Sequence, residues 1–469
     1  MAYATTNPYT NEVVETFPYA TDQEVDEALD RAHAAFASWS RVDVSERAAI
    51  FKKAANLLRE RTDELGDLAT LEVGKLLSQA RMEAAYMAAP IFDWVADNAE
   101  EILRPKKVEN PGVDRDVVIT YEPQGIVYSI QPWNVPFYQA ARGFAPAAIS
   151  GNVVILKHAS IVPQSAQAIV DLLTEAGLPD GVWQNLRLTH EQSDRLISDP
   201  RVRALTLTGS AAVGSHVASL AGKALRKSVL ELGGADAFVV LPDADIDQAI
   251  SGAAFRLYLS GQTCVSPKRM IVVDPLYDEF IEKLTAAFSG LKAGDPTDES
   301  TTLAPLSSQA AADTLRQQIR SAVEAGATAL PLGEPVPETG AFVQPTVLTN
   351  VAPENPAYYD ELFGPVFMVF RAPDIDTAIN LANDSLYGLA GSVWGRDTDR
   401  AFEVARRLDT GNVAINAGAI AGSIAQPFGG VKASGYGREL GPEGILEFVN
   451  IKGITLAGDP ESDVIPVFA

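Results

Sequence analysis

The chain has one cysteine, Cys264, and the residues around it suit a nucleophile. It ends the segment Gly261-Gln-Thr-Cys264, between an expected helix over residues 249–259 and an expected strand over 270–273. Such a polar segment is typical of an accessible turn, where a thiolate can attack a carbonyl carbon and form a covalent intermediate. The alternative is a buried small hydrophobe, the commonest fate of a free cysteine. A single thiol excludes disulfides within the chain and a zinc site built of several thiolates.

Two further side chains fit the chemistry of such a nucleophile. Glu231 ends an apolar strand before Leu232-Gly-Gly234, and burial there would raise the pKa of its carboxyl group toward neutrality, as suits a general base. The alternative for Glu231 is an ion pair with an arginine at a sheet edge. Asn134, in Pro132-Trp-Asn134, follows an expected strand over residues 126–130, so its amide can donate to an oxyanion. A plain turn residue is the alternative for Asn134.

Cofactor-binding features follow two other expected strands. Lys157 ends the strand over residues 153–156, and parallel sheets bind ligands at the carboxyl ends of their strands. Gly209-Ser210 follows the strand over residues 204–208 and begins a helix, whose free backbone amides can hold a phosphate. The run lacks the G-x-G-x-x-G pattern, so a plain strand–helix turn is an equal alternative. A solvated strand end is the alternative for Lys157.

The elements that must position these residues alternate between short apolar strands and helices. Strands over residues 153–156, 204–208 and 229–232 are joined by expected helices over residues 163–176 and 211–225. Strands joined by crossover helices indicate a parallel sheet with both faces covered. A second α/β stretch follows, with expected strands over residues 238–241, 270–273, 366–370 and 391–394. The fold class is therefore α/β, with two domains.

The segment before Pro132 has a different character. The first hundred residues have mostly helical spacing, beginning with a capping pattern from Thr21 to Glu24. Residues 116–121 and 126–130 are then expected as two strands around a turn.

Composition excludes several classes of function. The chain carries 37 basic and 61 acidic residues, and a net charge of −24 repels nucleic acid and anionic membranes. No apolar run reaches about 18 residues, so no transmembrane helix is expected. The four histidines lack metal-ligand spacing, so no histidine-rich metal site is expected, and a site built of carboxylates alone is the alternative; we expect no metal. The polar N-terminus has no export signal, and we expect a cytoplasmic protein.

Six segments follow one another in a fixed order along nearly the whole chain. They are Pro132-Trp-Asn134, Thr208-Gly-Ser210, Glu231-Leu-Gly-Gly234, Gly261-Gln-Thr-Cys264, Glu361-Leu-Phe-Gly-Pro365 and Pro427-Phe-Gly-Gly-Val-Lys432. Cys264 follows Glu231 by 33 residues. This order and spacing resemble the aldehyde dehydrogenase superfamily.

The resemblance implies a catalytic mechanism. In the superfamily a cysteine thiolate adds to an aldehyde, and an asparagine side chain and the cysteine's own amide stabilise the resulting oxyanion. Hydride transfer to a nicotinamide leaves a thioester, and a glutamate activates the water that releases the acid. The matching residues are Cys264, Asn134 and Glu231. Members that pass the acyl group to coenzyme A usually lack that glutamate, and a catalytically silent structural relative would lack the cysteine.

The resemblance also implies the cofactor contacts. Glu361 matches the ligand of the nicotinamide ribose, Phe363 lies beside the ring, and Trp133 lies at the nicotinamide end. Lys157 and the Gly209-Ser210 pair match other cofactor-contacting positions.

Cofactor choice depends on the third residue after Lys157. NAD-preferring relatives commonly carry a glutamate there, whose carboxylate would repel a 2′-phosphate. This chain has Ser160, which does not repel the phosphate and can donate a hydrogen bond. We therefore expect NADP, with NAD as the alternative.

The substrate-binding positions look most like those of bacterial succinate-semialdehyde dehydrogenases. In that group an arginine nine residues after the tryptophan binds the substrate carboxylate, and Arg142 occupies this place. Pairing with an acidic neighbour is the alternative for Arg142. A second arginine usually lies six residues before the cysteine, where this chain has Tyr258. Ser423 is expected to supply a further polar contact. Succinate semialdehyde is the expected substrate, and another aliphatic or aromatic aldehyde is the alternative.

The family architecture implies two Rossmann-like α/β domains and a small β oligomerisation arm. The expected dinucleotide-binding domain covers residues 1–104 and 124–234, and the catalytic domain covers 235–435. Residues 105–123 and 436–469 are expected to form the arm and tail. A homodimer or homotetramer is the expected assembly.

Overall fold

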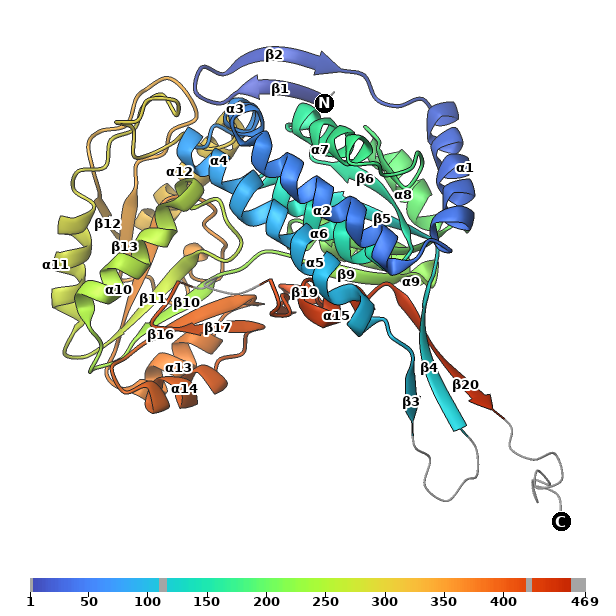
Figure 1. Ribbon diagram of the computed structural model, residues 1–469. Coiled ribbons are helices and arrows are strands. Elements are labelled where there is room, and N and C mark those ends of the chain that lie inside the picture. Colours follow the sequence, from blue (N-terminus) through green and yellow to red (C-terminus); the bar gives the residue numbers. More distant parts are fainter. Residues whose placement is uncertain (1–2, 109–115, 419–423, 457–469) are drawn as a thin grey trace.

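Two sheets of mainly parallel strands lie side by side, each covered by helices (Figure 1). The computed structural model describes residues 3–108, 116–418 and 424–456. A slender antiparallel arm projects from the body beside the first sheet (Figure 1). The α/β class predicted from the sequence is confirmed.

The first sheet carries the strands that were expected to lead into the site. Within the described residues it has six strands, in the order β19-β9-β8-β5-β6-β7, and only β19 is antiparallel to its neighbour. The five parallel strands have the spatial order 3-2-1-4-5, as in doubly wound sheets that bind dinucleotides at their carboxyl ends. The strands are β5 (Ile126–Gln131), β6 (Val153–His158), β7 (Trp183–Asn185), β8 (Val202–Thr208), β9 (Lys227–Glu231) and β19 (Gly435–Tyr436).

Helices cover both faces of the first sheet. Because parallel crossovers are right-handed, the helices after β5 and β6 lie on one face and those after β7 and β8 on the other. Proline begins both α6 and α7, in the first turn where its missing N–H costs no hydrogen bond. The helices are α1 (Asp22–Trp39), α2 (Val44–Glu60), α3 (Thr62–Val73), α4 (Leu77–Met82), the π-helical turn η1 (Glu83–Ala88), α5 (Ala89–Ile102), α6 (Pro136–Ile149), α7 (Pro163–Glu175), α8 (His190–Ser198) and α9 (Ala211–Lys223).

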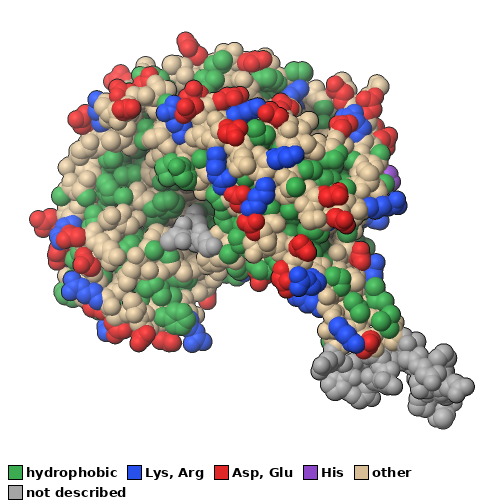
Figure 2. Space-filling model, in the orientation of Figure 1, with side chains coloured by type: hydrophobic (Ala, Val, Ile, Leu, Met, Phe, Trp, Pro, Cys, Tyr) green, Lys and Arg blue, Asp and Glu red, His purple; other side chains and the backbone are tan. Residues whose placement is uncertain are grey.

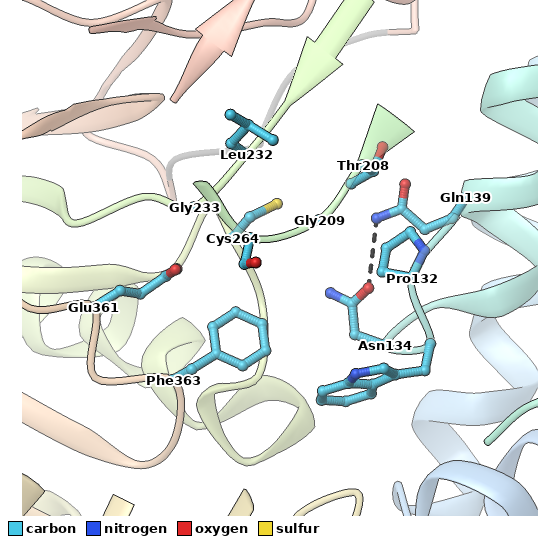
Figure 3. Close-up of a pocket in the computed structure, with 12 residues that line it drawn as sticks. Pro132, Asn134, Gln139, Thr208, Gly209, Leu232, Gly233, Cys264, Glu361 and Phe363 are labelled. Atoms are coloured by element: carbon cyan, nitrogen blue, oxygen red, sulfur yellow. Dashed lines mark hydrogen bonds between the residues drawn. The ribbon is translucent and has the colours of Figure 1, made fainter. Parts of the chain in front are cut away.

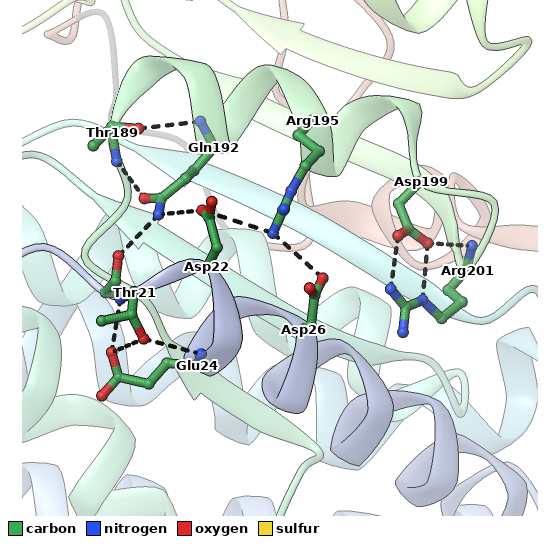
Figure 4. A network of polar contacts seen from close by, with 10 residues as sticks. Thr21, Asp22, Glu24, Asp26, Thr189, Gln192, Arg195, Asp199 and Arg201 are labelled. Carbon is green, nitrogen blue, oxygen red and sulfur yellow. Dashed lines mark hydrogen bonds and ion pairs between the residues drawn. The ribbon is translucent and has the colours of Figure 1, made fainter.

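Helices α1 and α8 begin side by side with matching caps (Figure 4). The Thr21 hydroxyl accepts from the Glu24 amide at 3.2 Å, and the Glu24 carboxylate accepts from the Thr21 amide at 2.7 Å. This confirms the capping box predicted from the sequence. Thr189 and Gln192 form the same arrangement at α8. The Gln192 side-chain amide also donates to Asp22 at 2.9 Å, which bonds the two helix starts to each other.

The second sheet has an additional parallel strand. Its order within the described residues is β12-β13-β14-β11-β10-β16-β17, and only β12 is antiparallel to its neighbour. Without β13, the five strands from β14 to β17 have the same 3-2-1-4-5 order as the first sheet. The strands are β10 (Asp236–Val240), β11 (Pro267–Val273), β12 (Thr328–Pro331), β13 (Thr346–Thr349), β14 (Val366–Ala372), β16 (Ala390–Trp394) and β17 (Asn412–Ile415).

Side chains alternate between two cores along the central strand of this sheet. Phe238 and Val240 pack in the core under α10 and α11, whereas Ala237 and Val239 face the core under α12, α13 and α14. A strand buried on both faces therefore reads as a continuous apolar run, as the sequence showed. The helices are α10 (Ile246–Ala253), the 3₁₀ segment η2 (Ala254–Gly261), α11 (Tyr277–Ala287), α12 (Gln309–Glu324), η3 (Pro356–Tyr358), α13 (Ile375–Asn383) and α14 (Thr398–Arg406).

The projecting arm corrects one local expectation. The strands expected around the turn after residue 121 both form, but they do not pair with each other. β4 (Asp116–Pro123) pairs with β3 (Lys106–Val108) and β20 (Val449–Leu456) in the arm, while β5 enters the first sheet. The reason is burial, because β5 is almost wholly buried and β4 is only partly so.

The remaining elements close the body. The hairpin β1 (Tyr3–Asn7) and β2 (Glu12–Phe17) lies over the helices, β15 (Tyr387–Gly388) pairs with β18 (Val431–Lys432), and α15 is Gly441–Leu446. Phe428 and Ile445 pack in the core of the first sheet, so the end of the chain returns to it. The domain boundaries given above stay a prediction. None of the helices in the described ranges is both long and apolar enough to cross a bilayer.

The surface mixes charges of both signs. On the face shown in Figure 2, Asp and Glu side chains are dispersed among Lys and Arg. Hydrophobic side chains border a hollow near the middle of that face (Figure 2).

Candidate active site

Cys264 and Asn134, two of the residues predicted to carry the chemistry, lie where the two sheets meet, whereas the third, Glu231, lines neither of the two cavities described below. The carboxyl ends of β5, β8 and β9 lead into this region, and the segments that precede β11 and β14 enter it from the other side. Together they line a cavity of about 290 Å³ (Figure 3). The lining residues are Pro132, Trp133, Asn134, Gln139, Thr208, Gly209, Ser210, Leu232, Gly233, Cys264, Glu361 and Phe363.

A second cavity, of about 420 Å³, shares Asn134, Gln139 and Cys264 with the first. Its other walls are Met82, Tyr86, Met87, Val135, Tyr138, Arg142, Phe255, Tyr258, Thr263, Val265, Ile424 and Phe428. A thiol shared by two cavities can meet one reactant from each, as a reaction between a cofactor and a substrate requires.

The turn before Cys264 has an unusual backbone. η2 ends in Leu259 and Ser260, which have left-handed φ values of 50° and 51°, and in Gly261 with φ 78°. A Cβ on Gly261 would lie 2.2 Å from the main-chain oxygen of Gly364, so only glycine fits. Such strained residues are held by their surroundings and cluster at functional sites. The surrounding residues therefore hold the backbone of this turn in one conformation.

The thiol of Cys264 is partly accessible in the two cavities. Burial raises its pKa to about 11, with Asp236 and Glu361 acting in the same direction. The charges of Arg142 and Lys268 oppose this rise. In the state described the sulfur is therefore mostly protonated at neutral pH, and these two cations favour its ionised form.

Asn134 is fixed on both sides of its amide. Its Nδ2 donates to the main-chain oxygen of Gln262 at 3.0 Å, and its Oδ1 accepts from Gln139 at 3.5 Å (Figure 3). Lys75 donates to its main-chain oxygen at 3.3 Å. Since an amide nitrogen has two protons, one donor of Asn134 is left for an oxyanion.

Glu231 is 1% exposed at the end of β9. Within the described residues, neither of its carboxylate oxygens has a hydrogen-bond partner. Burial, followed by the nearby charge of Glu439, raises the pKa of Glu231 well above its usual value, although Arg142 and Arg438 oppose the shift. A buried carboxyl group without partners is costly to keep charged, so it is ready to accept a proton.

Arg142 is 2% exposed and pairs with an acidic neighbour, the alternative that the sequence left open. Its Nε lies 2.5 Å from Glu439 Oε2, and its Nη2 donates to the Thr208 hydroxyl at 3.2 Å. Burial lowers the pKa of Arg142, but Glu439, together with Tyr138, Glu231 and Cys264, raises it by more, so the net pKa lies above its usual value. Glu439 also accepts from Thr206 at 2.8 Å. Arg142 thus reaches the second cavity as half of a buried ion pair.

Glu361 and Phe363 lie opposite the residues of the first sheet (Figure 3). Glu361 Oε1 accepts from the Gly234 amide at 3.1 Å and lies 3.2 Å from Lys268 Nζ. A Cβ on Gly233 would lie 2.3 Å from Glu361 Oε2, which explains the glycine. Phe363 meets Trp133 edge to face, with ring centres 6.0 Å apart.

Lys157 and Ser160 lie at the end of β6 and line neither of the two cavities described above. Burial lowers the pKa of Lys157, and its ammonium lies 5.9 Å from the centre of the Tyr3 ring. The main-chain oxygen of Ser160 accepts from the Ala4 amide at 3.0 Å. Ser210 caps α9, its hydroxyl accepting from Val213 at 3.4 Å. These residues share the carboxyl edge of the first sheet with the cavity that contains Cys264.

Tyr258 lies in the wall of the second cavity. Its ring stacks on Phe255, with centres 5.5 Å apart, and its hydroxyl points to the sulfur of Met87 at 3.5 Å. Arg256, two residues earlier, is buried elsewhere and donates to the main-chain oxygens of Gly261 and Val366. Ser423 lies outside the described residues.

Sequence reasoning missed three polar residues at the site. Lys268 contacts Glu361, Glu439 pairs with Arg142, and Gln139 bonds to Asn134. The pair Lys268-Arg269 inside an otherwise apolar strand was a usable signal, because lysine is almost never fully buried without a partner. Glu439 and Gln139 carried no comparable signal.

Comparison with known proteins agrees with the site. A sequence model of the Aldehyde dehydrogenase family matches residues 1–454. The chain is 47% identical over 451 residues to a protein of Deinococcus radiodurans named succinate-semialdehyde dehydrogenase (NADP⁺), covering 96% of this chain and 94% of that protein.

Solved structures show the same fold. Succinic semialdehyde dehydrogenase from Streptococcus pyogenes, in complex with NADP⁺, has a TM-score of 0.94 and 42% identity, covering 97% of this chain and 100% of that one. A salicylaldehyde dehydrogenase from Pseudomonas putida G7, complexed with salicylaldehyde, has a TM-score of 0.93 and 31% identity, covering 98% of this chain and 95% of that one. The resemblance noted in the motifs is confirmed, and the chain belongs to the aldehyde dehydrogenase family.

Proposed function

We propose that this enzyme oxidises succinate semialdehyde to succinate with NADP, through a covalent intermediate on Cys264. The observation that carries the proposal is the position of Cys264, which belongs to both cavities together with Asn134. The names of the relatives described above support the substrate and the cofactor.

The first step forms a bond between sulfur and the aldehyde carbon. The thiolate of Cys264 attacks that carbon, and the carbonyl oxygen becomes an oxyanion as its π bond breaks. The remaining Nδ2 proton of Asn134 donates to the oxyanion, so that charge develops against a fixed dipole. Arg142 and Lys268 favour the thiolate, as their effect on its pKa indicates.

The first cavity fits a nicotinamide cofactor. Its walls combine the carboxylate of Glu361, which suits ribose hydroxyls, with the rings of Trp133 and Phe363. Gly209 and Ser210 offer the amides of a helix N-terminus, which suit a phosphate. When bound, the nicotinamide supplies the hydride acceptor.

Glu231 acts in acid release. Once hydride has left the thiohemiacetal carbon, Cys264 carries a thioester. Glu231 accepts a proton from water, the hydroxide oxygen bonds to the acyl carbon, and the carbon–sulfur bond breaks to regenerate the thiolate. Its burial and lack of hydrogen bonds within the described residues support this role, because they raise its affinity for a proton.

Ser160 and Lys157 favour NADP over NAD. Both lie at the end of β6, on the edge of the sheet where dinucleotides bind. The ammonium of Lys157 attracts a 2′-phosphate, and Ser160 presents a hydroxyl in place of a repelling carboxylate.

Arg142 anchors the substrate carboxylate in this proposal, with Ser423 as a further contact. The guanidinium lines the second cavity and attracts an anion even while it is paired with Glu439. A second candidate substrate is an uncharged aromatic or aliphatic aldehyde. The observation that favours it is the cavity wall, in which Tyr86, Tyr138, Phe255, Tyr258 and Phe428 surround one partly neutralised cation.

The assembly in this proposal is a homodimer or homotetramer formed through the arm. Ile451, Ile454 and Leu456 of β20 are exposed large hydrophobic residues, which suits a surface that becomes covered. The cytoplasm, where thiols stay reduced, suits a catalytic cysteine.

A screen of aldehydes against both cofactors tests the proposal. Succinate semialdehyde, butanal and benzaldehyde are each assayed with NADP and NAD, following reduced cofactor by absorbance. The proposal expects the highest kcat/KM for succinate semialdehyde with NADP. Preference for benzaldehyde or butanal selects the second candidate, and oxidation of none of the three contradicts both.

A further inference from the structure

Lys268 is a fully buried cation four residues after the nucleophile. It is the second residue of β11 and is 0% exposed. A buried lysine normally needs partners for its charge, because desolvation of an ammonium is costly.

Its partners come from two sides of the site. Nζ donates to the main-chain oxygens of Cys264 at 2.7 Å and Thr263 at 3.0 Å. On the other side Nζ lies 3.2 Å from Glu361 Oε1 and 5.8 Å from the centre of the Phe363 ring. The three protons of the ammonium are thus directed to two carbonyls of the nucleophile turn and to one carboxylate.

We propose that Lys268 is a positioning residue that ties the orientation of Cys264 to the carboxylate of Glu361. This inference rests on the proposed function, in which Glu361 holds the cofactor ribose. One cation then fixes both the peptide group that follows the sulfur and the group that sets the position of the nicotinamide. The spacing between nucleophile and hydride acceptor is therefore set through a single side chain.

The charges of Lys268 and Glu361 shift the pKa of the Cys264 thiol in opposite directions. Lys268 lowers the pKa of Cys264 and Glu361 raises it. The other groups that face the thiol are Arg142 from α6, which also lowers its pKa, and Asp236 from β10, which raises it. Tyr138 of α6 is likewise coupled to Cys264. A substitution at Lys268 or Glu361 leaves these other groups in place.

The test uses the single thiol and needs no turnover. Alkylation of Cys264 by iodoacetamide is followed by mass spectrometry as a function of pH, and NADP affinity by fluorescence titration. Lys268→Met should move the alkylation midpoint up by about one pH unit, because a nearby positive charge is lost. Glu361→Gln should move it down, because a nearby negative charge is lost.

Both substitutions should weaken NADP binding by about 10-fold, because each disturbs the carboxylate that holds the ribose. Lys268→Arg keeps the charge and should leave the alkylation midpoint close to that of the native enzyme. Lys283→Met, in α11 at an exposed ion pair with Asp247, is the matched control and should change neither readout.

If Lys268 and Glu361 only supported the fold, both substitutions would shift the alkylation midpoint of Cys264 in the same direction. Equal or absent shifts of the alkylation midpoint in Lys268→Met and Glu361→Gln overturn the inference, as does unchanged NADP affinity in a folded Lys268→Met. Where Lys268→Met does not fold, an absent or upward shift in Glu361→Gln overturns it. Failure of the native enzyme to oxidise any aldehyde would instead contradict the proposed function and leave these shifts as they are.

Discussion

Arg142 and Glu439 form a buried ion pair, 2.5 Å apart, beside the cavity that contains Cys264. Glu439 also raises the pKa of Glu231 and Arg142 lowers it, so both members of the pair act on the proposed base. The charges of the Arg142–Glu439 pair therefore affect both substrate binding and acid release.

Arg142→Met should discriminate between substrates. Loss of a charge-assisted contact costs on the order of 1.5–3 kcal/mol, so kcat/KM for succinate semialdehyde should fall by about 10- to 150-fold. For butanal, which has no carboxylate, kcat/KM should fall far less. Steady-state kinetics of both substrates on both proteins measure the difference.

The control must separate binding from stability, because the substitution leaves Glu439 charged and unpaired. Breaking a buried pair in this way costs about 3–5 kcal/mol of unfolding free energy. Arg142→Met/Glu439→Gln should recover much of that loss in urea unfolding while keeping the substrate effect relative to Glu439→Gln alone. Equal kinetic losses for both aldehydes would make Arg142 structural and favour the uncharged substrate.

Glu231→Gln should slow acid release by about 10²–10⁴-fold, the usual contribution of a general base. Since hydride leaves before hydrolysis, the variant should show a burst of reduced cofactor followed by slow turnover. Stopped-flow absorbance measures the burst. Unchanged steady-state turnover would remove Glu231 from this role.

The same substitution should stabilise the protein, and more so as pH rises. The folded-state pKa of Glu231 lies well above the usual 4.5, so above that pH the unfolded chain loses a proton that the folded chain retains. This favours unfolding increasingly until the folded pKa is reached. Glutamine does not titrate, so the gain in unfolding free energy should be larger at about pH 8 than at about pH 5. An equal gain at both values would mean that Glu231 is not a buried titrating group.

Ser160→Glu should weaken NADP far more than NAD. A carboxylate facing the 2′-phosphate would cost roughly 10- to 100-fold in affinity. Dissociation constants for both cofactors give the ratio, and Ser160→Gln supplies a neutral control of the same shape. If the native enzyme already prefers NAD strongly, the interpretation of Ser160 is wrong.

Much of the fold could be predicted from the spacing of apolar residues and from the residues that cap helices and form turns. The helix expected over residues 163–176 forms as Pro163–Glu175, and the capping box at Thr21 forms as expected. Such features depend on neighbours along the chain, so a local pattern contains them. The pairing of β4 with β20 does not, because its partner lies more than three hundred residues away.

The site was predictable in its residue types and less so in its contacts. Asn134 and Cys264 were expected together, and they line the same two cavities. The left-handed turn at Leu259 and Ser260 could not be read from the sequence, because leucine has no preference for that conformation. The pairing of Arg142 with Glu439 joins segments far apart, and only the folded chain reveals it.

The central claim is that Cys264 is the covalent nucleophile, and the turnover of Cys264→Ala tests it most directly. Alanine keeps the backbone and removes only the sulfur, the atom that forms the bond to the aldehyde carbon. The account predicts loss of aldehyde oxidation with NADP affinity close to that of the native enzyme. Substantial residual oxidation by Cys264→Ala would contradict it.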